Sequence, residues 1–257
     1  MALPLYIAEQ SNNMNISQLK QLLKSLAALL LLLVLVHLPG ESTAQRRKVQ
    51  NLPKYDKQRI HFGFLLGINV TDFTIRRIPT FNSLDSLYVV ESVPQTGFNI
   101  GIISNLRLGE HFDLRFVPDL AFSQRNLDYT FYENGKPTVV TKQIESSFLE
   151  FPLDIKFKSK RINNYRGYVL AGVKYSIDMV SQAKVENADK DFVKLKRKDF
   201  GYTIGLGFDF YLERFKFAPE IKMYHGLNNL LVDDPKIFSS SLSSLKSKIF
   251  LISFTFE

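Results

Sequence analysis

The sequence contains no cysteine. A chain without cysteine has neither a disulfide framework nor a thiolate metal site, so its stability must come from packing and backbone hydrogen bonding. Histidine is scarce as well, with only His37, His61, His111 and His225 spread along the chain. Such a scatter does not indicate a histidine metal site. We therefore expect neither a metal nor another cofactor.

The sequence also lacks the short motifs that mark common chemistries. It has no G-x-S-x-G nucleophile elbow, no P-loop, no G-x-G-x-x-G dinucleotide motif and no H-E-x-x-H zinc motif. One alternative is an acyl-transfer enzyme with His225 as its base, because serine and aspartate residues follow it. An interfacial histidine is the simpler interpretation, so we expect no catalytic residue and no enzyme.

Long apolar runs are absent after residue 44, and one occurs before it. Residues 26–38 are apolar, follow two lysines and precede small residues that end at Ala44. This order predicts a secretory signal peptide over residues 1–44, and a start at Met14 would give it a normal length. The run is shorter than the roughly 20 residues with which a helix crosses a bilayer. Any membrane crossing must therefore be made by strands.

Positive charge exceeds negative charge, giving a net charge of +8 and a pI of about 9.4. The positive residues are dispersed and an exported chain rarely meets DNA, so we expect no nucleic-acid partner. Residues 45–59 form a basic segment, which we interpret as a solvated periplasmic tail or a contact for lipid phosphates or a periplasmic protein. Its cationic members are Arg46, Arg47, Lys48, Lys54, Lys57 and Arg59.

The chain does contain a repeated alternation of apolar residues with small or polar ones. In residues 200–210 one parity is aromatic or aliphatic, while the other carries glycines, Thr203 and Asp209. Residues 248–257 alternate in the same way. A period of two residues predicts strands, because successive side chains then point to opposite faces. We expect strands at residues 60–73, 96–108, 112–130, 139–159, 166–178, 200–211, 215–225 and 248–257.

These segments predict an all-β fold, namely an eight-stranded antiparallel up-and-down transmembrane β-barrel over residues 60–257, preceded by the signal peptide. Tight and long connections alternate along the chain, and transmembrane barrels have their short turns in the periplasm. Both termini would then be periplasmic. The tight connections are residues 109–110, 160–165 and 212–214, and the outer loops are residues 74–95, 133–138, 181–199 and 226–247.

Several predicted strands carry charged residues on the parity opposite the apolar one. Because side chains fill a narrow barrel, we expect these residues to form a paired network inside it, with the apolar parity facing lipid. The network has a structural role in this interpretation. Its predicted members are Asp113, Arg115, Asp119, Arg125, Glu150, Asp154, Lys156, Asp209, Lys216, Glu220 and Lys222.

Three prolines, Pro118, Pro152 and Pro219, lie inside predicted strands. Since proline removes a ladder donor, we expect bulges or kinks at all three. A soluble barrel of the lipocalin type would show the same alternation with the apolar face inside. Glycine on the polar parity and aromatic residues near strand ends favour the membrane barrel.

A second basic stretch lies in the predicted outer loop at residues 181–199. It contains Lys194, Lys196, Arg197 and Lys198, which we interpret as a solvated loop or as a contact for lipopolysaccharide phosphates. The expected partners of the barrel itself are outer-membrane lipid and lipopolysaccharide.

A more specific resemblance lies in a series of short strings that follow one another in order over nearly the whole mature chain. Together they are similar to the PorT family of outer-membrane proteins, which is associated with type IX protein secretion and gliding motility. The strings are HFGFLLGIN at 61–69, NLRLGEHFDLR at 105–115, ESSFLEFPL at 145–153, KS at 158–159, RINNY at 161–165, AGVKY at 171–175, GFDFY at 207–211 and FKFAPE at 215–220.

The resemblance implies an integral outer-membrane barrel required for the assembly or operation of a type IX secretion machinery, with other secretion-system proteins as partners. It supplies no enzymatic residue. A barrel of eight strands is too narrow to conduct a polypeptide, so we expect it to act by protein contacts and not as the pore. A small outer-membrane barrel that serves as an adhesin or envelope stabiliser is the alternative.

Overall fold

The structure, a computed structural model, describes residues 50–78, 87–133, 136–180, 193–232 and 237–257. The chain divides into two units, Met1–Lys48 and Val49–Glu257, and the described residues belong to the second. The predicted signal peptide and residues 45–49 of the basic segment lie outside them. So do residues 79–86, 134–135, 181–192 and 233–236 of the predicted outer loops. Within the described part, no helix is long and apolar enough to cross a membrane.

The described residues form almost only antiparallel strands. Two short helical segments accompany them, η1 (Tyr55–Lys57) and α2 (Ile237–Ser240). The strands are β1 (Ile60–Arg77), β2 (Leu87–Val93), β3 (Gln95–Arg107), β4 (Phe112–Phe116), β5 (Asp119–Glu133), β6 (Lys136–Lys158), β7 (Tyr165–Asp178), β8 (Lys198–Tyr211), β9 (Lys216–Gly226) and β10 (Leu242–Phe256).

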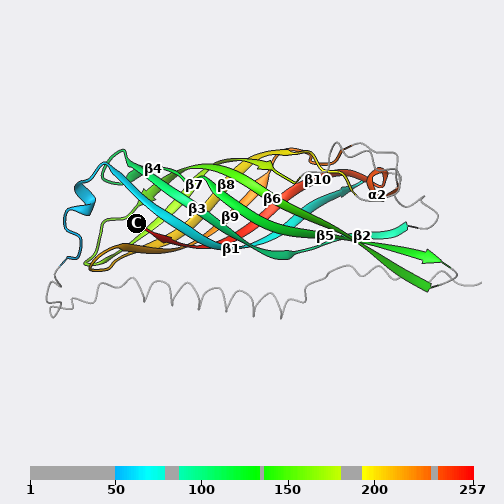
Figure 1. Ribbon diagram of the computed structural model, residues 1–257, viewed down its shortest axis with the longest axis horizontal. Helices are drawn as coiled ribbons and strands as arrows, with labels where there is room; N and C mark the ends of the chain where they lie inside the picture. Colours follow the sequence, from blue (N-terminus) through cyan, green and yellow to red (C-terminus); the bar gives the residue numbers. More distant parts are fainter. Residues whose placement is uncertain (1–49, 79–86, 134–135, 181–192, 233–236) are drawn as a thin grey trace, which may run out of the picture. The chain divides into compact units, whose positions relative to one another are not determined.

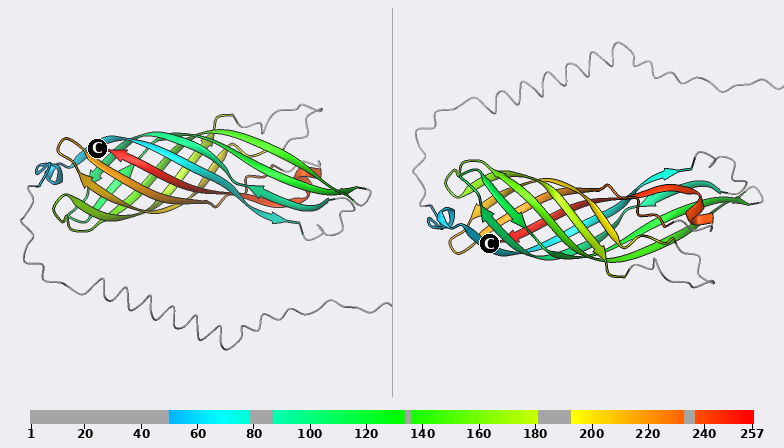
Figure 2. Two further views of the ribbon diagram at one scale, coloured as in Figure 1. Left: turned by 90° about the horizontal axis from the view of Figure 1, so that it is seen from below. Right: turned by 90° about the horizontal axis from the view of Figure 1, so that it is seen from above.

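The sheet closes on itself. β1 pairs with β10 on one side and with β3 on the other, so that Phe64 lies opposite both Phe256 and Ile102. Figures 1 and 2 show the result as a ring of tilted strands. Closure pairs every described strand except β2 on both sides and removes the exposed sheet edges that a bilayer would not tolerate.

The sheet has ten strands where the alternation predicted eight. β2 and β3 lie end to end along β5, with Val93 opposite Asn126 and Phe98 opposite Phe122. β4 and β5 likewise run end to end along β6. Each of these pairs occupies a single position in the ring. β2 falls within residues 74–95, so the prediction of a loop over that whole range is wrong.

The structure has no bulge at Pro152 or Pro219, although the ladder between β8 and β9 is interrupted beside Pro219. The register of β6 with β7 runs without a shift across Pro152, and that of β9 with β10 runs without a shift across Pro219. The break between β4 and β5 falls at Val117 and Pro118, opposite Pro152. Proline lacks an N–H and therefore loses a hydrogen bond on one side of its strand only. The ladder is interrupted at Pro118, and no extra residue is inserted.

One parity of each barrel strand faces outward and the other faces the interior. On β8, Ile204 is 54% exposed and Leu206 50%, while Thr203 is 7% exposed and Asp209 is fully buried. The apolar face is therefore outside, which contradicts the soluble lipocalin-type alternative. On β1 the exposed apolar residues alternate from residue 60 to residue 68. That length is close to the 9–11 residues with which a tilted strand crosses a bilayer.

Aromatic pairs on neighbouring strands are part of the outer apolar band. Phe64 stacks on Phe256 with ring centroids 4.8 Å apart, and Phe98 stacks on Phe122 at 4.7 Å. Exposed aromatic rings on neighbouring strands are typical of transmembrane barrels, whose outer faces are rich in aromatic residues.

The sheet extends beyond this band at one end only, the end that we call the loop end. β5 and β6 continue as a hairpin as far as the pair Glu133 and Lys136, and Figure 1 shows this hairpin projecting past the ring. β1 and β10 also continue, as far as Arg77 opposite Leu242. The opposite end, which carries η1 and the C-terminal residue, is called the plug end.

Candidate functional site: a closed barrel interior

All eleven charged residues taken from the alternation are buried, and none is more than 6% exposed. They line the interior from the plug end to the middle of the barrel. Five of them form ion pairs with four charged residues that were not among the predicted network members. These four are Lys158, Arg166, Lys174 and Glu257.

Arg115 on β4 is the centre of one ion-pair group at the plug end. Its guanidinium forms an ion pair with Glu220 on β9 and lies 3.6 Å from the Glu257 carboxylate. Lys216 Nζ is 2.9 Å from the same Glu257 carboxylate. Two cations and two carboxylates from three parts of the ring are thereby joined, and buried charges are stable only when they are paired in this way.

Asp209 on β8 is the centre of a second group. Lys156 Nζ lies 2.9 Å from its carboxylate, Arg166 Nη2 lies 3.2 Å away, and Lys216 Nζ lies 3.6 Å away. Close by, Lys158 Nζ is 2.5 Å from Asp113. Since Lys216 belongs to both groups, the two form one continuous network.

The middle of the barrel is less completely paired. Lys174 Nζ lies 2.6 Å from Glu150, and Lys222 Nζ lies 3.5 Å from Glu220. Asp119 is held by Asn99, whose amide nitrogen is 3.3 Å from it, and Asp154 accepts a hydrogen bond from Thr203. Neither aspartate has an ion-pair partner within the described ranges.

Arg125 departs from the prediction in a different way. Its guanidinium donates to the hydroxyls of Ser247 and Ser146, at 3.1 and 3.2 Å, instead of to a carboxylate. It also lies over the rings of Phe73 and Phe148, at 4.3 and 5.1 Å from their centroids. Cation–π contacts of this kind accompany the hydroxyl hydrogen bonds in holding the buried charge.

Little space remains between these side chains. A cavity of about 30 Å³ lies in the middle of the interior, lined by residues such as Asn69, Asp119, Glu150 and Lys174. A volume of that size holds one or two water molecules. Within the residues that the structure describes, the interior is therefore a packed polar core.

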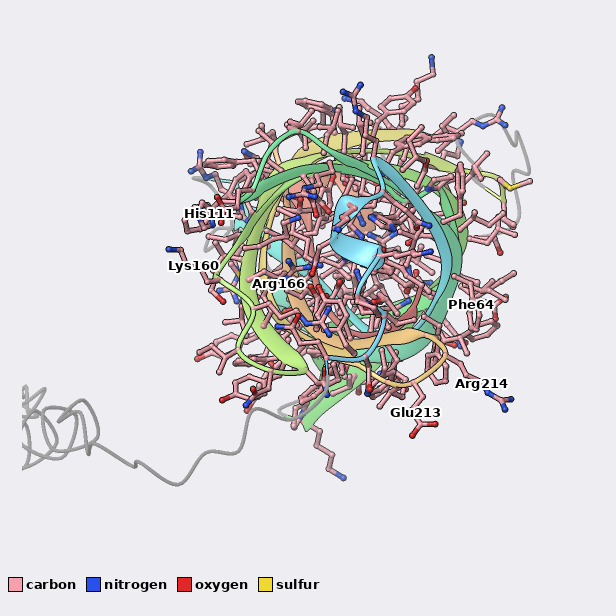
Figure 3. All side chains as sticks on the ribbon, turned by 90° about the vertical axis from the view of Figure 1, so that its left-hand side faces the viewer. Phe64, His111, Lys160, Arg166, Glu213 and Arg214 are labelled. Atoms are coloured by element: carbon pink, nitrogen blue, oxygen red, sulfur yellow. The ribbon has the colours of Figure 1, made fainter. Side chains whose placement is uncertain are left out.

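At the plug end, residues 50–58 fold back over the mouth of the barrel. Asn51 donates from its backbone N–H to Asn164 Oδ1 at 2.9 Å and from its side chain to the Tyr211 carbonyl at 3.0 Å. Asp56 in η1 forms ion pairs with Arg161 at 3.3 Å and Arg166 at 3.1 Å. Figure 3, which looks onto this end, shows the short helix lying across the ring.

Tyr55 fixes the same segment from its other side. Its ring stacks on His61 with centroids 3.9 Å apart, and its hydroxyl donates to Glu257 at 2.9 Å. Burial, together with the nearby Glu257 carboxylate, raises the pKa of the Tyr55 hydroxyl, so this group remains a donor. We call residues 50–58 the plug.

The charge of the plug contacts differs from the sequence interpretation. Lys54, Lys57 and Arg59, the described members of the basic segment, are exposed, and the acidic Asp56 makes the contacts with the barrel. Burial raises the pKa of Asp56, but the charges of Arg166 and Arg161 and the hydrogen bond from Arg161 outweigh it. The net effect is a pKa below the ordinary value of 3.8. The plug is therefore held by an ionised carboxylate.

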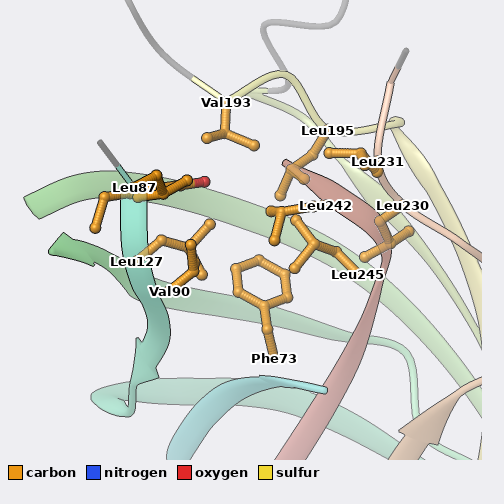
Figure 4. Packing of buried hydrophobic residues seen from close by; sticks show 11 residues of the cluster. Phe73, Leu87, Val90, Leu127, Val193, Leu195, Leu230, Leu231, Leu242 and Leu245 are labelled. Carbon is orange, nitrogen blue, oxygen red and sulfur yellow. The ribbon is translucent and has the colours of Figure 1, made fainter. Parts of the chain in front are cut away.

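At the loop end the interior is closed by apolar side chains. Leu127 and Leu245 are fully buried in this cluster, and Tyr129 donates to the Phe238 carbonyl of α2 at 2.7 Å. We call the cluster the apolar cap; Figure 4 shows how its side chains converge from separate strands and loops. Its buried members are Phe73, Leu87, Val90, Leu127, Tyr129, Val193, Leu195, Leu230, Leu231, Leu242 and Leu245.

His225, the residue considered as a catalytic base, lies on β9 with its ring 5.7 Å from that of Tyr202 on β8. Within the described ranges it has no side-chain hydrogen bond to a serine or an aspartate. No group of three or more histidine, aspartate or glutamate residues suited to a metal ion is found there either.

The missed network members divide into two kinds. Three of them, Lys158, Arg166 and Lys174, lie on the inward parity of β6 and β7. The alternation of apolar and polar residues was therefore sufficient to predict their positions. Asp56 carries no such signal, because it precedes the first strand in a segment whose composition is basic.

A closed antiparallel sheet with an apolar outer face and an ion-paired interior is a transmembrane β-barrel. Residues 43–232 match the family model described as outer membrane protein beta-barrel domain, and the chain belongs to this family. The barrel is thus a domain of the bacterial outer membrane, and its apolar face contacts membrane lipid.

Solved outer-membrane barrels are similar to this chain at low identity. OprG from Pseudomonas aeruginosa is 12% identical, with a TM-score of 0.42 and coverage of 77% of this chain and 96% of its own. Neisserial surface protein A is 10% identical, with a TM-score of 0.41 and coverage of 77% and 98%. Ail, the attachment invasion locus protein of Yersinia pestis, is 11% identical, with a TM-score of 0.36 and the same two coverages. The search of curated proteins finds no match.

Proposed function

We propose that this chain is a member of the PorT family and that it supports the assembly or operation of a type IX protein secretion and gliding machinery by contacts with other proteins. It does not conduct the secreted protein, and it is not an enzyme. The strings quoted from the sequence support the family membership. The closed interior supports a role by contact.

The single observation that supports a role by contact is that the described residues cover both ends of the barrel and fill its middle. The plug covers one end, ion pairs fill the interior, and the apolar cap covers the other end. A polypeptide passing through would have to displace all three and leave buried charges unpaired.

The proposed orientation places the plug end in the periplasm and the loop end outside the cell. The short connections between β3 and β4, β6 and β7, and β8 and β9 all lie at the plug end, as periplasmic turns of transmembrane barrels do. The surfaces available for protein contacts are then the plug with its exposed lysines and the projecting hairpin of β5 and β6.

Gene deletion combined with complementation tests the proposal. Deletion is expected to abolish secretion of proteins that carry a type IX sorting signal, and the wild-type gene should restore it. Crosslinking in the membrane should attach secretion components to the chain. Unchanged secretion in the deletion strain would refute the proposed role.

A variant with a shortened hairpin tests whether the hairpin, and not the rest of the barrel, makes the essential contact. Phe131 and Thr138 are directly opposite in the sheet, so an Asn-Gly turn can replace residues 132–137 without disturbing the barrel below. If the hairpin makes the essential contact, this variant will insert normally but fail to restore secretion. An Arg214→Gln change in a plug-end turn is the matched control and should restore it.

The second candidate function is that of an adhesin or envelope stabiliser. The projecting hairpin favours it, because it presents Tyr132 and Val139 at 49% and 56% exposure beyond the membrane band. Binding of whole cells to host or neighbouring-cell surfaces, lost in the shortened variant while secretion remains normal, would support this alternative over the secretion role.

A further inference from the structure

We propose that a pocket at the rim of the plug end binds the phosphate of a membrane lipid headgroup. The pocket has a volume of about 280 Å³ and lies between the turn that joins β3 to β4 and the turn that joins β6 to β7. This site rests on the outer-membrane barrel itself and is independent of the secretion role.

The lining of the rim pocket is predominantly cationic. Four cations, Arg107, Lys160, Arg161 and Arg166, face two carboxylates, Asp56 and Glu110, which leaves an excess of two positive charges. Figure 3 shows Lys160 and His111 at the edge of the ring and Arg166 inside it. An anion entering the pocket would meet charge-assisted hydrogen-bond donors from both turns.

Two of these cations are already neutralised, and two are available. Asp56 pairs with both Arg161 and Arg166, and Arg166 also pairs with Asp209. The Arg107 side chain makes one hydrogen bond, from Nε to the Gly109 carbonyl at 3.0 Å. Neither Arg107 nor Lys160 has an ion-pair partner among the residues that the structure describes. These two are the donors that a phosphate would engage first.

Arg161, which lines the pocket beside the plug residue Asp56, is held in place by several contacts. Arg161 donates from Nε to the Asn163 carbonyl at 2.8 Å and from Nη2 to Asn164 Oδ1 at 3.0 Å. Its guanidinium stacks over the Tyr211 ring, with its central carbon 3.6 Å from the ring centroid. Asn163 has a φ of 51°, a left-handed conformation that asparagine tolerates in a tight turn. The pocket therefore needs little reorganisation to bind an anion.

The position of the pocket points to a lipid and not to a free anion. Just below it on the outer face, Phe112 and Phe157 are about half exposed and pack with ring centroids 5.1 Å apart. His111 from the pocket lies 6.2 Å from the Phe157 ring. Exposed aromatic rings mark the headgroup level of a membrane, so acyl chains can lie along this pair while the phosphate enters the pocket.

Native mass spectrometry of the purified full-length barrel in detergent tests the site. The probes are phosphatidylglycerol, an uncharged galactolipid with the same acyl chains, and inorganic phosphate. We expect phosphatidylglycerol to bind in one-to-one stoichiometry and the galactolipid to bind at least about tenfold more weakly, since it lacks the charge-assisted contacts.

Variants locate the site on the barrel. Arg107→Gln combined with Lys160→Gln should weaken phosphatidylglycerol binding at least about tenfold. Lys57→Gln combined with Arg214→Gln removes the same charge from exposed positions at the same end and should leave binding unchanged. Each variant is first checked for the heat-modifiable gel shift of a folded barrel.

Three results would overturn the inference. Equal binding of the galactolipid would mean that the phosphate is not recognised. Equal losses in the two double variants would mean that only the overall charge matters. Inorganic phosphate that binds as tightly as phosphatidylglycerol and displaces it would make the pocket a site for free anions and not for lipid.

Discussion

Arg115 is the residue on which the interior depends most. It is 1% exposed and is shared by Glu220 and Glu257, so its removal leaves excess negative charge in a dry environment. We predict that Arg115→Met destabilises the folded barrel by about 3–5 kcal/mol, the usual cost of breaking a buried ion pair on one side. Urea unfolding in lipid vesicles, followed by the gel shift, measures this change.

A double variant provides the control for that experiment. Arg115→Met combined with Glu220→Gln removes one charge of each sign and should be more stable than Arg115→Met alone. Arg214→Met, at an exposed turn position, should change stability by less than about 0.5 kcal/mol. If Arg115→Met behaved like Arg214→Met, the ion pairs would not be needed to stabilise the barrel.

Asp56 makes attachment of the plug depend on pH. Its pKa is lowered in the folded state, so its contribution is fully present above the ordinary aspartate value of 3.8 and is lost as the pH falls through the lowered pKa. We predict that the plug is held at neutral pH and released only when the pH falls below the ordinary aspartate value of 3.8, through the lowered pKa of Asp56. Asp56→Asn should release it at neutral pH as well, because the amide cannot pair with Arg161 and Arg166.

The absence of cysteine allows a clean measurement of plug release. A nitroxide attached to Lys54→Cys should give an immobilised spectrum at neutral pH and a mobile one at acidic pH, while a label at Arg214→Cys should show no such change. A Lys54→Cys spectrum that is mobile at every pH, or unaffected by Asp56→Asn, would contradict the proposed role of Asp56.

Among the elements, the strands with strict alternation could be predicted from the sequence. β8 carries apolar residues on one parity and small or polar residues on the other, and both of its faces lie as expected. The boundaries at the loop end were less predictable. β10 begins at Leu242, six residues before the predicted start, because its first residues pair with the extension of β1 and not with a lipid-facing neighbour.

The apolar cap and β2 could not be predicted for a related reason. The cap draws its residues from strand extensions and from separate loop segments such as Val193 and Leu230, and no local period marks them as neighbours. β2 turns both Leu87 and Val90 into the cap, so it lacks the alternation of a strand with one lipid-facing side. The plug escaped prediction because Asn51, Tyr55 and Asp56 make its contacts, whereas the charged residues of the segment are mostly basic.

The apolar cap should stabilise the loop end of the barrel. Leu127 is fully buried and contributes to the packing between β5 and the loop segments, so Leu127→Ala should cost about 2–5 kcal/mol of local stability. We expect faster proteolysis of the loop end, while the membrane-embedded part keeps its gel shift. Val139→Ala, at a position that is 56% exposed, is the control and should have no effect. Equal cleavage of the two variants would refute a stabilising cap.

At the scale of the whole molecule, the closed interior and the apolar outer face have separate consequences. The outer face fixes the barrel in the membrane, whereas the ion pairs, plug and cap fill and cover the part of the interior that the structure describes. The proposed secretion role needs the apolar outer face, because it holds the protein in the outer membrane. It also needs the filled interior, because a protein without a pore must act by contact. The long hairpin of β5 and β6 and the plug then provide the protein surfaces on the two sides of the membrane.

Ion conductance across a planar bilayer that contains the purified, folded barrel tests this closed state most directly. The filled interior predicts no steady conductance above that of the lipid alone at neutral pH, with gel-shift analysis showing that the protein has inserted. A stable, ohmic channel formed by the wild-type barrel under these conditions would contradict the closed interior and, with it, the proposal that the protein acts by contact.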